Sequence, residues 1–522
     1  MKSVIVDGSY THTLSIPDEW EFSELKNVIN LVGGNQPPKS KFLYEEEEDT
    51  VRLIQIRDYK SDQHKVFIRK SDAKRFVEPT DVMIGRYGPP IFQILRGLKG
   101  AYNVALMKAE PVLGSFDKDY LYYYLSNQDL YNYVNSASDR TAGQSGVNKE
   151  HLEKYPVPVV PLAEQQEIVR QLDIMLAQVE QIKARLDAIP TILKKFRQSV
   201  LADAVSGKLT EEWRNSNEKN SEHNFESYIS DYRIQKYLEW EKESLLRKGK
   251  KIPSDEILLK KYKPTLSEEI TREGLPHGWS RQLLDGLIYI SARIGWKGLK
   301  AEEYTEEGPL FLSVHGLNYG KVVRLDQAFH ISQERYDESP EIALKNDDIL
   351  LCKDGAGIGK VGIVKGLDEP ASINSSLLLI RSGEIFVPEF LYYVFKGPYI
   401  QKLVQERLTG TAIPHLFQRD IKEFLLDLPP LDEQKLIVEK VEAYFNWVEK
   451  IENTVQTAQK RVKLLTQSIL AKAFSGELTA EWREQHQELI TGINSAESLL
   501  AKIQAGREAS KPAKKTRKKK EV

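Results

Sequence analysis

Two stretches of the chain carry apolar residues at alternating spacings of four and three positions. Ten such positions from Ile168 to Val200 are apolar, and so are the ten from Ile437 to Ile469. This pattern is typical of a helix that packs along one narrow stripe, and it runs further than an ordinary globular helix. The seam residues are Ile168, Leu172, Met175, Val179, Ile182 and Leu186 in the first stretch, and Ile437, Val441, Tyr444, Val448, Ile451 and Val455 in the second.

Each seam needs an apolar partner, and the nearest one available is the other seam. We therefore expect one antiparallel two-helix coiled coil within the chain, which would place the segments before the helices at opposite ends. Pro190 lies within the first seam, and an interior proline costs about 3 kcal/mol and usually ends or kinks a helix. We expect the first helix to be divided into about 162–188 and 190–206, with Ser206-Gly207 as a C-cap.

The two helices belong to a tandem duplication that covers most of the chain. Residues 161–214 align with 430–483 without a gap, at an offset of 269 and with 22 identities in 54 positions. The segments before them match only in short pieces, such as 17–20 with 276–279. These segments mix strand-like runs, helix candidates and dense turns. The fold class we expect is therefore α+β: a pseudo-twofold duplication of two mixed α/β domains, separated by the coiled coil.

Composition narrows the possible functions. The chain has 522 residues, 41% of them hydrophobic, and its formal net charge of −2 argues against a coat protein for nonspecific nucleic-acid binding. A single cysteine, Cys352, excludes an internal disulfide and a multi-cysteine zinc site, and it favours a reducing, cytoplasmic setting. No apolar run approaches the roughly 18 residues of a membrane span, so we expect no membrane partner.

Charge is distributed unevenly between the two domains. Residues 51–108 carry 12 Lys or Arg against 5 Asp or Glu, with aromatic residues among them. This mixture suits phosphate neutralisation and contacts to bases, and a solvated charged surface would have the same composition. Residues 281–365 have 11 basic and 13 acidic residues, so the candidates there are local. The candidate nucleic-acid contacts in the two regions are Arg57, Arg69, Arg86, Tyr87, Arg96 and Lys99, and Arg293, Lys297, Lys300, His315, Asn318, Lys353 and Lys360.

We find no catalytic motif in the sequence. Residues 354–360, Asp-Gly-Ala-Gly-Ile-Gly-Lys, lack the first glycine and the following Ser or Thr of a phosphate loop. Residues 88–91, Gly-Pro-Pro-Ile, lack the polar first residue and the aromatic last residue with which amino-methyltransferases hold a base. The nine histidines show no metal-ligand spacing. We therefore expect no catalytic residue, metal or cofactor in this chain; a DNA enzyme with an unrecognised site is an alternative.

The chain resembles the DNA-specificity subunits of type I restriction-modification systems, most of all the enterobacterial type IA group. The resemblance rests on Pro-Leu-x-Glu-Gln at 161–165 and 430–434, on Gly-x-Leu-Thr-x-x-Trp-Arg at 207–214 and 476–483, and on Leu-Pro-x-Gly-Trp at 275–279. It implies target-recognition domains at 1–155 and 275–424, spacer helices at 156–214 and 425–508, a charged helical linker at 215–274 and a basic disordered tail at 509–522.

The resemblance also implies a function. Each target-recognition domain would read one half of a bipartite, asymmetric double-stranded DNA site, and the helices would set the spacer. Two modification subunits would bring S-adenosylmethionine and methylate adenine N6, and restriction subunits would use ATP and Mg²⁺, while this chain stays non-catalytic. A coiled-coil scaffold that binds only proteins is the alternative from another class.

Two late loops match each other around Thr-Ala and are candidates for reading bases. They lie at 140–146 and 409–419, near the end of each domain. In the major groove Arg and Lys pair with guanine, and Asn and Gln pair with adenine. Turns that cap helices would fit the same residues. These loops add Arg140 and Gln144, and His415, Gln418 and Arg419, to the candidate contacts.

Overall fold

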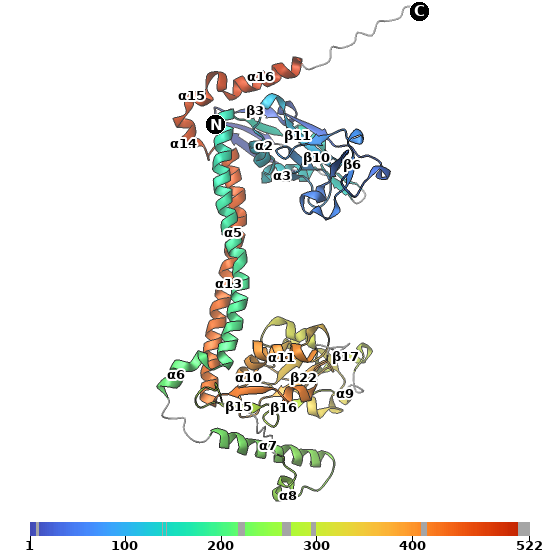
Figure 1. Ribbon diagram of the computed structural model, residues 1–522, viewed down its shortest axis with the longest axis vertical. Helices are drawn as coiled ribbons and strands as arrows, with labels where there is room; N and C mark the ends of the chain where they lie inside the picture. The colour runs from blue at the N-terminus through green and yellow to red at the C-terminus, as the bar shows by residue number, and fades with distance from the viewer. Residues whose placement is uncertain are drawn as a thin grey trace, which may run out of the picture. The chain divides into compact units, whose positions relative to one another are not determined.

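The computed structural model describes residues 1–6, 10–137, 139–141, 144–217, 225–263, 273–293, 299–408 and 415–509. The chain divides into two compact units, Met1–Asp187 with Val455–Val522, and Ala188–Thr454. Within the described ranges no helix has the length and apolar character that a bilayer crossing requires. Each unit has one sheet-rich domain and parts of the two long helices (Figure 1), which are α5 (Leu162–Val205) and α13 (Leu431–Phe474).

The first unit is built around a four-stranded antiparallel sheet in the order β4–β11–β8–β9. Its strand β8 (Val82–Gly85) is buried along its whole length because successive side chains enter two different cores. Val82 and Ile84 enter the main core, and Met83 enters a smaller one. The other strands are β4 (Ile29–Gly33), β9 (Gln93–Leu95) and β11 (Leu106–Pro111).

Smaller elements complete the first domain. A second sheet has the order β6–β5–β10–β7, and in it β5 and β10 are parallel. Two antiparallel pairs lie outside these sheets: β1 with β2, which follow each other in the chain, and β3 with β14, which do not. The bounds are β1 (Lys2–Val6), β2 (His12–Ile16), β3 (Glu21–Glu24), β5 (Thr50–Ile54), β6 (Phe67–Arg69), β7 (Phe76–Val77), β10 (Gly100–Tyr102), β14 (Pro156–Val159), α2 (Lys118–Leu125) and α3 (Gln128–Ser136).

The second unit repeats this plan with the sheet order β16–β22–β19–β20. Strand β19 (Ile349–Cys352) is again buried on both faces: Leu351 enters one core, and Leu350 and Cys352 enter another. A second sheet has the order β18–β17–β21, and β15 pairs with β23. The bounds are β15 (Ser280–Leu283), β16 (Tyr289–Ser291), β17 (Tyr304–Leu312), β18 (Phe329–Ile331), β20 (Val361–Ile363), β21 (Ala371–Ile373), β22 (Leu377–Arg381), α10 (Pro388–Lys396), α11 (Pro398–Leu408) and β23 (Leu425–Leu428).

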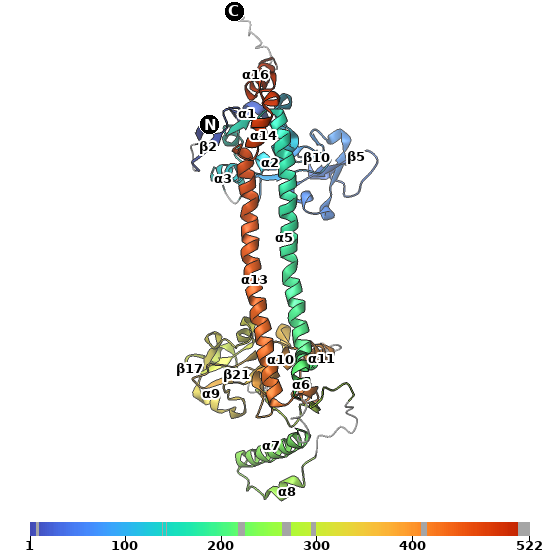
Figure 2. The ribbon, with the colours of Figure 1, turned by 90° about the vertical axis from the view of Figure 1, so that its left-hand side faces the viewer.

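The long helices α5 and α13 have 44 residues each and lie side by side (Figure 2). In the first unit Ile168 shares a core with Phe474, and in the second Phe196 lies 5.9 Å from Tyr444 between ring centroids. Early residues of one helix therefore meet late residues of the other, so the pair is antiparallel. The expected α+β fold, with two mixed α/β domains and a pair of long antiparallel helices, is confirmed.

Most of the predicted seam residues are at least half-buried in their own unit. Ile182 and Tyr444 are the most exposed of them, at 45% and 42%. The buried seam residues are Ile168, Leu172, Val179, Ile437, Val441, Val448 and Val455, and the partly buried ones are Met175, Leu186 and Ile451.

The prediction that Pro190 divides the first helix is wrong. Helix α5 continues through Pro190 without a break, and this residue lies on the exposed side. Val179 before it and Leu193 after it are both buried. The loss of one backbone hydrogen bond is therefore outweighed by apolar burial on the opposite face of the helix.

A buried carboxylate joins the long helices to the domain in the first unit. Glu164, in the first turn of α5, is fully buried and accepts three bonds. The donors are the indole Nε1 of Trp20 at 2.8 Å, the hydroxyl of Thr479 at 2.7 Å and the guanidinium of Arg483 at 3.1 Å. Burial raises the pKa of Glu164, and these three donors oppose that rise.

The second unit contains the same joint made from the matching residues. Glu433, in the first turn of α13, accepts bonds from Trp279 at 2.8 Å and Thr210 at 2.6 Å, and it pairs with Arg214. In each joint the carboxylate begins one copy of the repeat, while the threonine and the arginine end the other copy. The repeated Pro-Leu-x-Glu-Gln and Gly-x-Leu-Thr-x-x-Trp-Arg motifs are therefore the two sides of one contact.

In each unit a further helix, which follows the threonine and the arginine of the joint in sequence, packs on the domain. In the second unit α7 (Phe225–Arg247), from the predicted linker, buries Ile229 and Tyr232 in the domain core, and Arg233 donates to the carbonyl of Leu283 at 2.6 Å. In the first unit α16 (Ala496–Ala509) buries Ile503. The described part of the linker is thus a helix of the second domain rather than a free tether.

Gly476 allows us to test the joint in the first unit. Its φ is +82°, and a Cβ there would lie 2.4 Å from Cγ of Pro17. We expect Gly476→Ala to lower the free energy of unfolding by about 3 kcal/mol, because backbone strain and a clash add together. The matched control is Gly492→Ala, which has a φ of +61° and nothing within 4 Å, so it should lose only about 1 kcal/mol. Urea unfolding of the full chain measures both; equal losses would contradict the role of the contact.

Candidate nucleic-acid interface

In the first unit, the loop after strand β8 holds the segment that leads out of the late loop. The carbonyl of Arg86 accepts a bond from the backbone N–H of Val147 at 2.9 Å, and Tyr87 forms a bridge with Gly146. The late loop itself contains a short hairpin, β12 (Asp139–Thr141) with β13 (Gln144–Gly146). The side chains of Arg140 and Gln144 lie outside the described part of the structure.

The second unit has the same arrangement after strand β19. The carbonyl of Lys353 accepts from the N–H of Leu416 at 3.0 Å, and Asp354 forms a bridge with His415. Both domains therefore anchor the late loop on the end of a strand that is buried on both faces. Both also place a cation at the anchor, whereas the next residue is Tyr87 in one domain and Asp354 in the other.

The second unit has a hollow of about 490 Å³ beside this anchor. It brings together four of the predicted residues: Lys353 from the loop after β19, His415 from the segment before α12 (Gln418–Lys422), and Gln418 and Arg419 from the start of that helix. Asp354 accepts from the imidazole Nδ1 of His415 and from Lys353 at 3.0 Å, so it orients both side chains. The residues around the hollow are Ala292, Lys353, Leu378, His415, Leu416, Phe417, Gln418, Arg419 and Lys422.

Four more predicted residues of the second unit are exposed: Lys300, His315, Asn318 and Lys360. Lys360 donates to the side-chain carbonyl of Asn318 at 2.6 Å, and His315 is 2.9 Å from the hydroxyl of Tyr319. Lys300 is exposed at the start of a short 3-10 turn. Lys297 lies outside the described residues.

The assignment of Arg293 as a DNA contact is corrected by its burial. This side chain is 3% exposed, and its guanidinium donates to the carbonyl of Ile373 and the hydroxyl of Ser372, both at 3.2 Å. It also lies over the ring of Phe311, and burial lowers its pKa. Arg293 therefore stabilises its own domain instead of facing a ligand.

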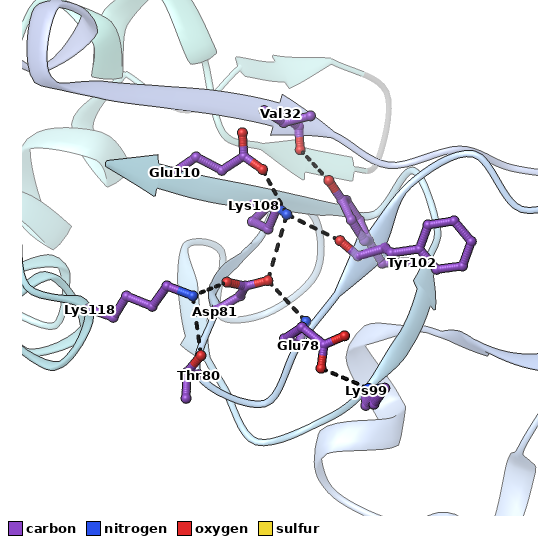
Figure 3. Close-up of polar contacts among 10 residues, drawn as sticks. Val32, Glu78, Thr80, Asp81, Lys99, Tyr102, Lys108, Glu110 and Lys118 are labelled. Atoms are coloured by element: carbon purple, nitrogen blue, oxygen red, sulfur yellow. Dashed lines mark hydrogen bonds and ion pairs between the residues drawn. The ribbon is translucent and has the colours of Figure 1, made fainter. Parts of the chain in front are cut away.

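In the first unit, acidic partners offset much of the basic surplus. Figure 3 shows Asp81 between Lys118, at 2.7 Å, and Lys108, at 3.6 Å, with Lys99 bound to Glu78 at 3.1 Å. Lys108 also pairs with another carboxylate, that of Glu110, at 2.7 Å. Of the predicted residues, Lys99 is thus exposed but paired.

The remaining predicted residues of the first unit are also held by local partners. Arg69 pairs with Glu47 at 2.6 Å. Arg96 pairs with Asp119, and its guanidinium lies 3.9 Å from the ring centroid of Tyr122. Contacts of two others are longer: Arg57 and Arg86 donate at 3.4 Å to the carbonyls of His64 and Val104. Tyr87 is 37% exposed.

Sequence reasoning missed Asp354, Phe417 and Lys422. Phe417 is 49% exposed, and the guanidinium of Arg419 lies 5.1 Å from its ring centroid. The match between the late loops pointed toward this place, but it named only His415, Gln418 and Arg419 there. In the described part of the chain no group of three His, Cys, Asp or Glu residues is arranged to hold a metal ion.

Comparison with known proteins gives the class to which this fold and surface belong. The family model described as "Type I restriction modification DNA specificity domain" matches residues 17–191 and 246–458. The chain belongs to this family: it is the DNA-specificity subunit of a type I restriction-modification system, a recognition subunit and not a catalytic one.

Individual relatives show which members of this family the chain is similar to. The EcoBI specificity subunit of Escherichia coli is 31% identical over 99% of this chain and 98% of the relative. The EcoKI specificity subunit of Escherichia coli strain K12 is 29% identical over 97% of this chain and 99% of the relative. These two relatives confirm the resemblance to the enterobacterial type IA group.

Solved structures agree with the fold. The HsdS subunit from Thermoanaerobacter tengcongensis has a TM-score of 0.53 at 16% identity and covers 88% of this chain and 98% of its own. A chain from a study of assembly and conformational transition of the type I R-M system has a TM-score of 0.59 at 15% identity, with coverages of 88% and 99%.

The charge network of Asp81 makes stability depend on pH. Burial alone would raise the pKa of Asp81, but the N–H of Glu78, Lys118 and Lys108 together lower it. A lowered pKa contributes stability above the unfolded value of about 3.9 that is lost as pH falls through the folded value. We expect Asp81→Asn to cost about 1 kcal/mol from pH 7 to about 5, and the cost to shrink below about pH 4. Urea unfolding against pH measures it; a cost independent of pH would contradict the ion-pair account.

Arg419 provides a direct test of the DNA surface. Its side chain is 77% exposed, and the nearest carboxylate oxygen, on Asp420, is 3.9 Å away. We expect Arg419→Gln to weaken DNA binding by the assembled complex and to lower the salt slope by about one. Lys402→Gln, equally exposed at 77% but on α11, is the matched control and should change neither. Equal effects of the two substitutions would mean that the hollow is not part of the interface.

Proposed function

We propose that the two domains read the two halves of a bipartite, asymmetric site in double-stranded DNA. The observation that carries this proposal is the matched anchor: the carbonyls of Arg86 and Lys353 hold the late loops by the same backbone bond. This shared backbone bond holds the late loop in the same position in each domain, and we call it the backbone frame. Different side chains on that frame, such as Tyr87 and Asp354, then read different bases.

The helices set the distance between the half-sites in this proposal. Each has 44 residues, so it is about 66 Å long at 1.5 Å per residue. The buried joints at Glu164 and Glu433 fix each domain to a helix end, which is what a spacer requires.

Partner subunits supply the chemistry. Two modification subunits bring S-adenosylmethionine and methylate adenine N6, and restriction subunits joined through them use ATP and Mg²⁺, in the cytoplasm. The helices carry exposed apolar side chains that suit such docking, among them Ile192 at 60%, Trp447 at 53% and Leu464 at 70% exposed.

Paired insertions test the role of the helices. Because Gln459 donates to Asp187 at 2.7 Å in the antiparallel pair, a site after Glu180 lies about opposite a site after Leu465. Seven residues at both sites keep the seam and add about 10 Å, or about three base pairs at ~3.4 Å each. We expect the spacer of the methylated site to lengthen by about three base pairs.

Methylation-aware sequencing of a host that expresses the whole system measures this spacer. The same seven residues placed after Gly249, an exposed residue between α7 and α8 (Asp255–Leu259), are the control and should leave the spacer unchanged. A paired insertion that keeps the original spacer with full methylation would overturn the proposed role of the helices.

A further inference from the structure

The charged side chains that border the hollow of the second unit are all hydrogen-bond donors. Lys353, Arg419 and Lys422 all border it, and ammonium and guanidinium groups donate hydrogen bonds but accept none. Gln418 adds an amide, which can donate as well as accept. A ligand edge that presents acceptors therefore matches this lining better than one that presents donors.

The carboxylate of Asp354 is already occupied, and Lys422 is likewise paired, with Asp285 at 3.3 Å. One oxygen of Asp354 accepts from the ring of His415, and the other accepts from Lys353 at 3.0 Å. This carboxylate therefore orients two side chains of the lining and offers little to a ligand that donates. Such a position differs from that of an aspartate that reads the amino group of cytosine.

The ring of Phe417, in the apolar part of the lining, orients the guanidinium of Arg419. The ring of Phe417 lies 4.4 Å from the ring of His415 between centroids, and the guanidinium of Arg419 lies 5.1 Å from the centroid of Phe417. Contact of a guanidinium with an aromatic ring limits the orientations of the guanidinium. Less conformational entropy is then lost when Arg419 binds a ligand.

We propose that this hollow receives the major-groove edge of a guanine in the half-site of the second domain, with Lys353 as the reader and Asp354 as its positioning residue. Guanine is the base that presents two adjacent acceptors there, O6 and N7. Adenine and cytosine would turn an amino group toward the donors, and thymine offers one acceptor beside a methyl group. This assignment rests on the proposed function, in which the second domain reads one half-site.

The first domain lacks this combination of groups. Tyr87 stands at the place of Asp354, and Gly146 stands at the place of His415. The inference therefore concerns the second half-site only.

The test uses the chain assembled with its modification subunits and a duplex containing the methylated site. Each guanine of each half-site is replaced singly by 7-deazaguanine, which keeps O6 and removes the N7 acceptor. We expect the wild-type complex to lose affinity about tenfold at one position of one half-site. Lys353→Met should bind more weakly and should no longer distinguish guanine from 7-deazaguanine at that position, while at every other guanine it should respond as the wild-type complex does.

Two further variants make the result decisive. Lys353→Arg keeps the donors and should retain discrimination at that position, whereas Lys402→Met, a matched loss of charge on α11, should behave as wild type. The inference is overturned if Lys353→Met keeps the full response to 7-deazaguanine at every position. The proposed function fails separately, if the wild-type complex shows no preference among DNA sequences.

Discussion

The rest of the molecule depends on a buried carboxylate at the start of each long helix. Glu164 and Glu433 would each be a buried charge without compensation if their donors were removed, and such charges cost several kcal/mol. The compensation comes from an indole of the adjoining domain and from a threonine and an arginine of the opposite helix end. One contact thus fixes domain, helix start and helix end together.

The duplicated frame explains how one fold can present two different surfaces. Strands β8 and β19 are buried on both faces, and the end of each holds a late loop by one backbone bond. Backbone bonds do not depend on side-chain identity, so the residues beside them are free to differ. Tyr87 in one domain and Asp354 in the other occupy the same place in this frame and offer different chemistry.

The sequence predicted the helices and the duplication well because both repeat over many residues. It failed at Pro190, where a local rule competes with burial along the whole seam. Among the candidate contacts it could not separate Arg293, which is buried, from Arg419, which is exposed, because both are arginines in polar surroundings. It also could not show that Lys118 would reach Asp81, since that pairing depends on the sheet that brings α2 beside β8.

Each joint combines the start of one copy with the end of the other, and this sets the order in which the two joints can form during synthesis. Glu164 leaves the ribosome 315 residues before its partner Thr479. Glu433 emerges after its partner Thr210, so the second joint can form as soon as Glu433 has been made. At ~5–20 residues per second the first carboxylate must wait on the order of tens of seconds. The first domain is therefore made first, but its joint to the helices forms last. A chain that ends before Thr479 would leave the joint of the first domain unformed.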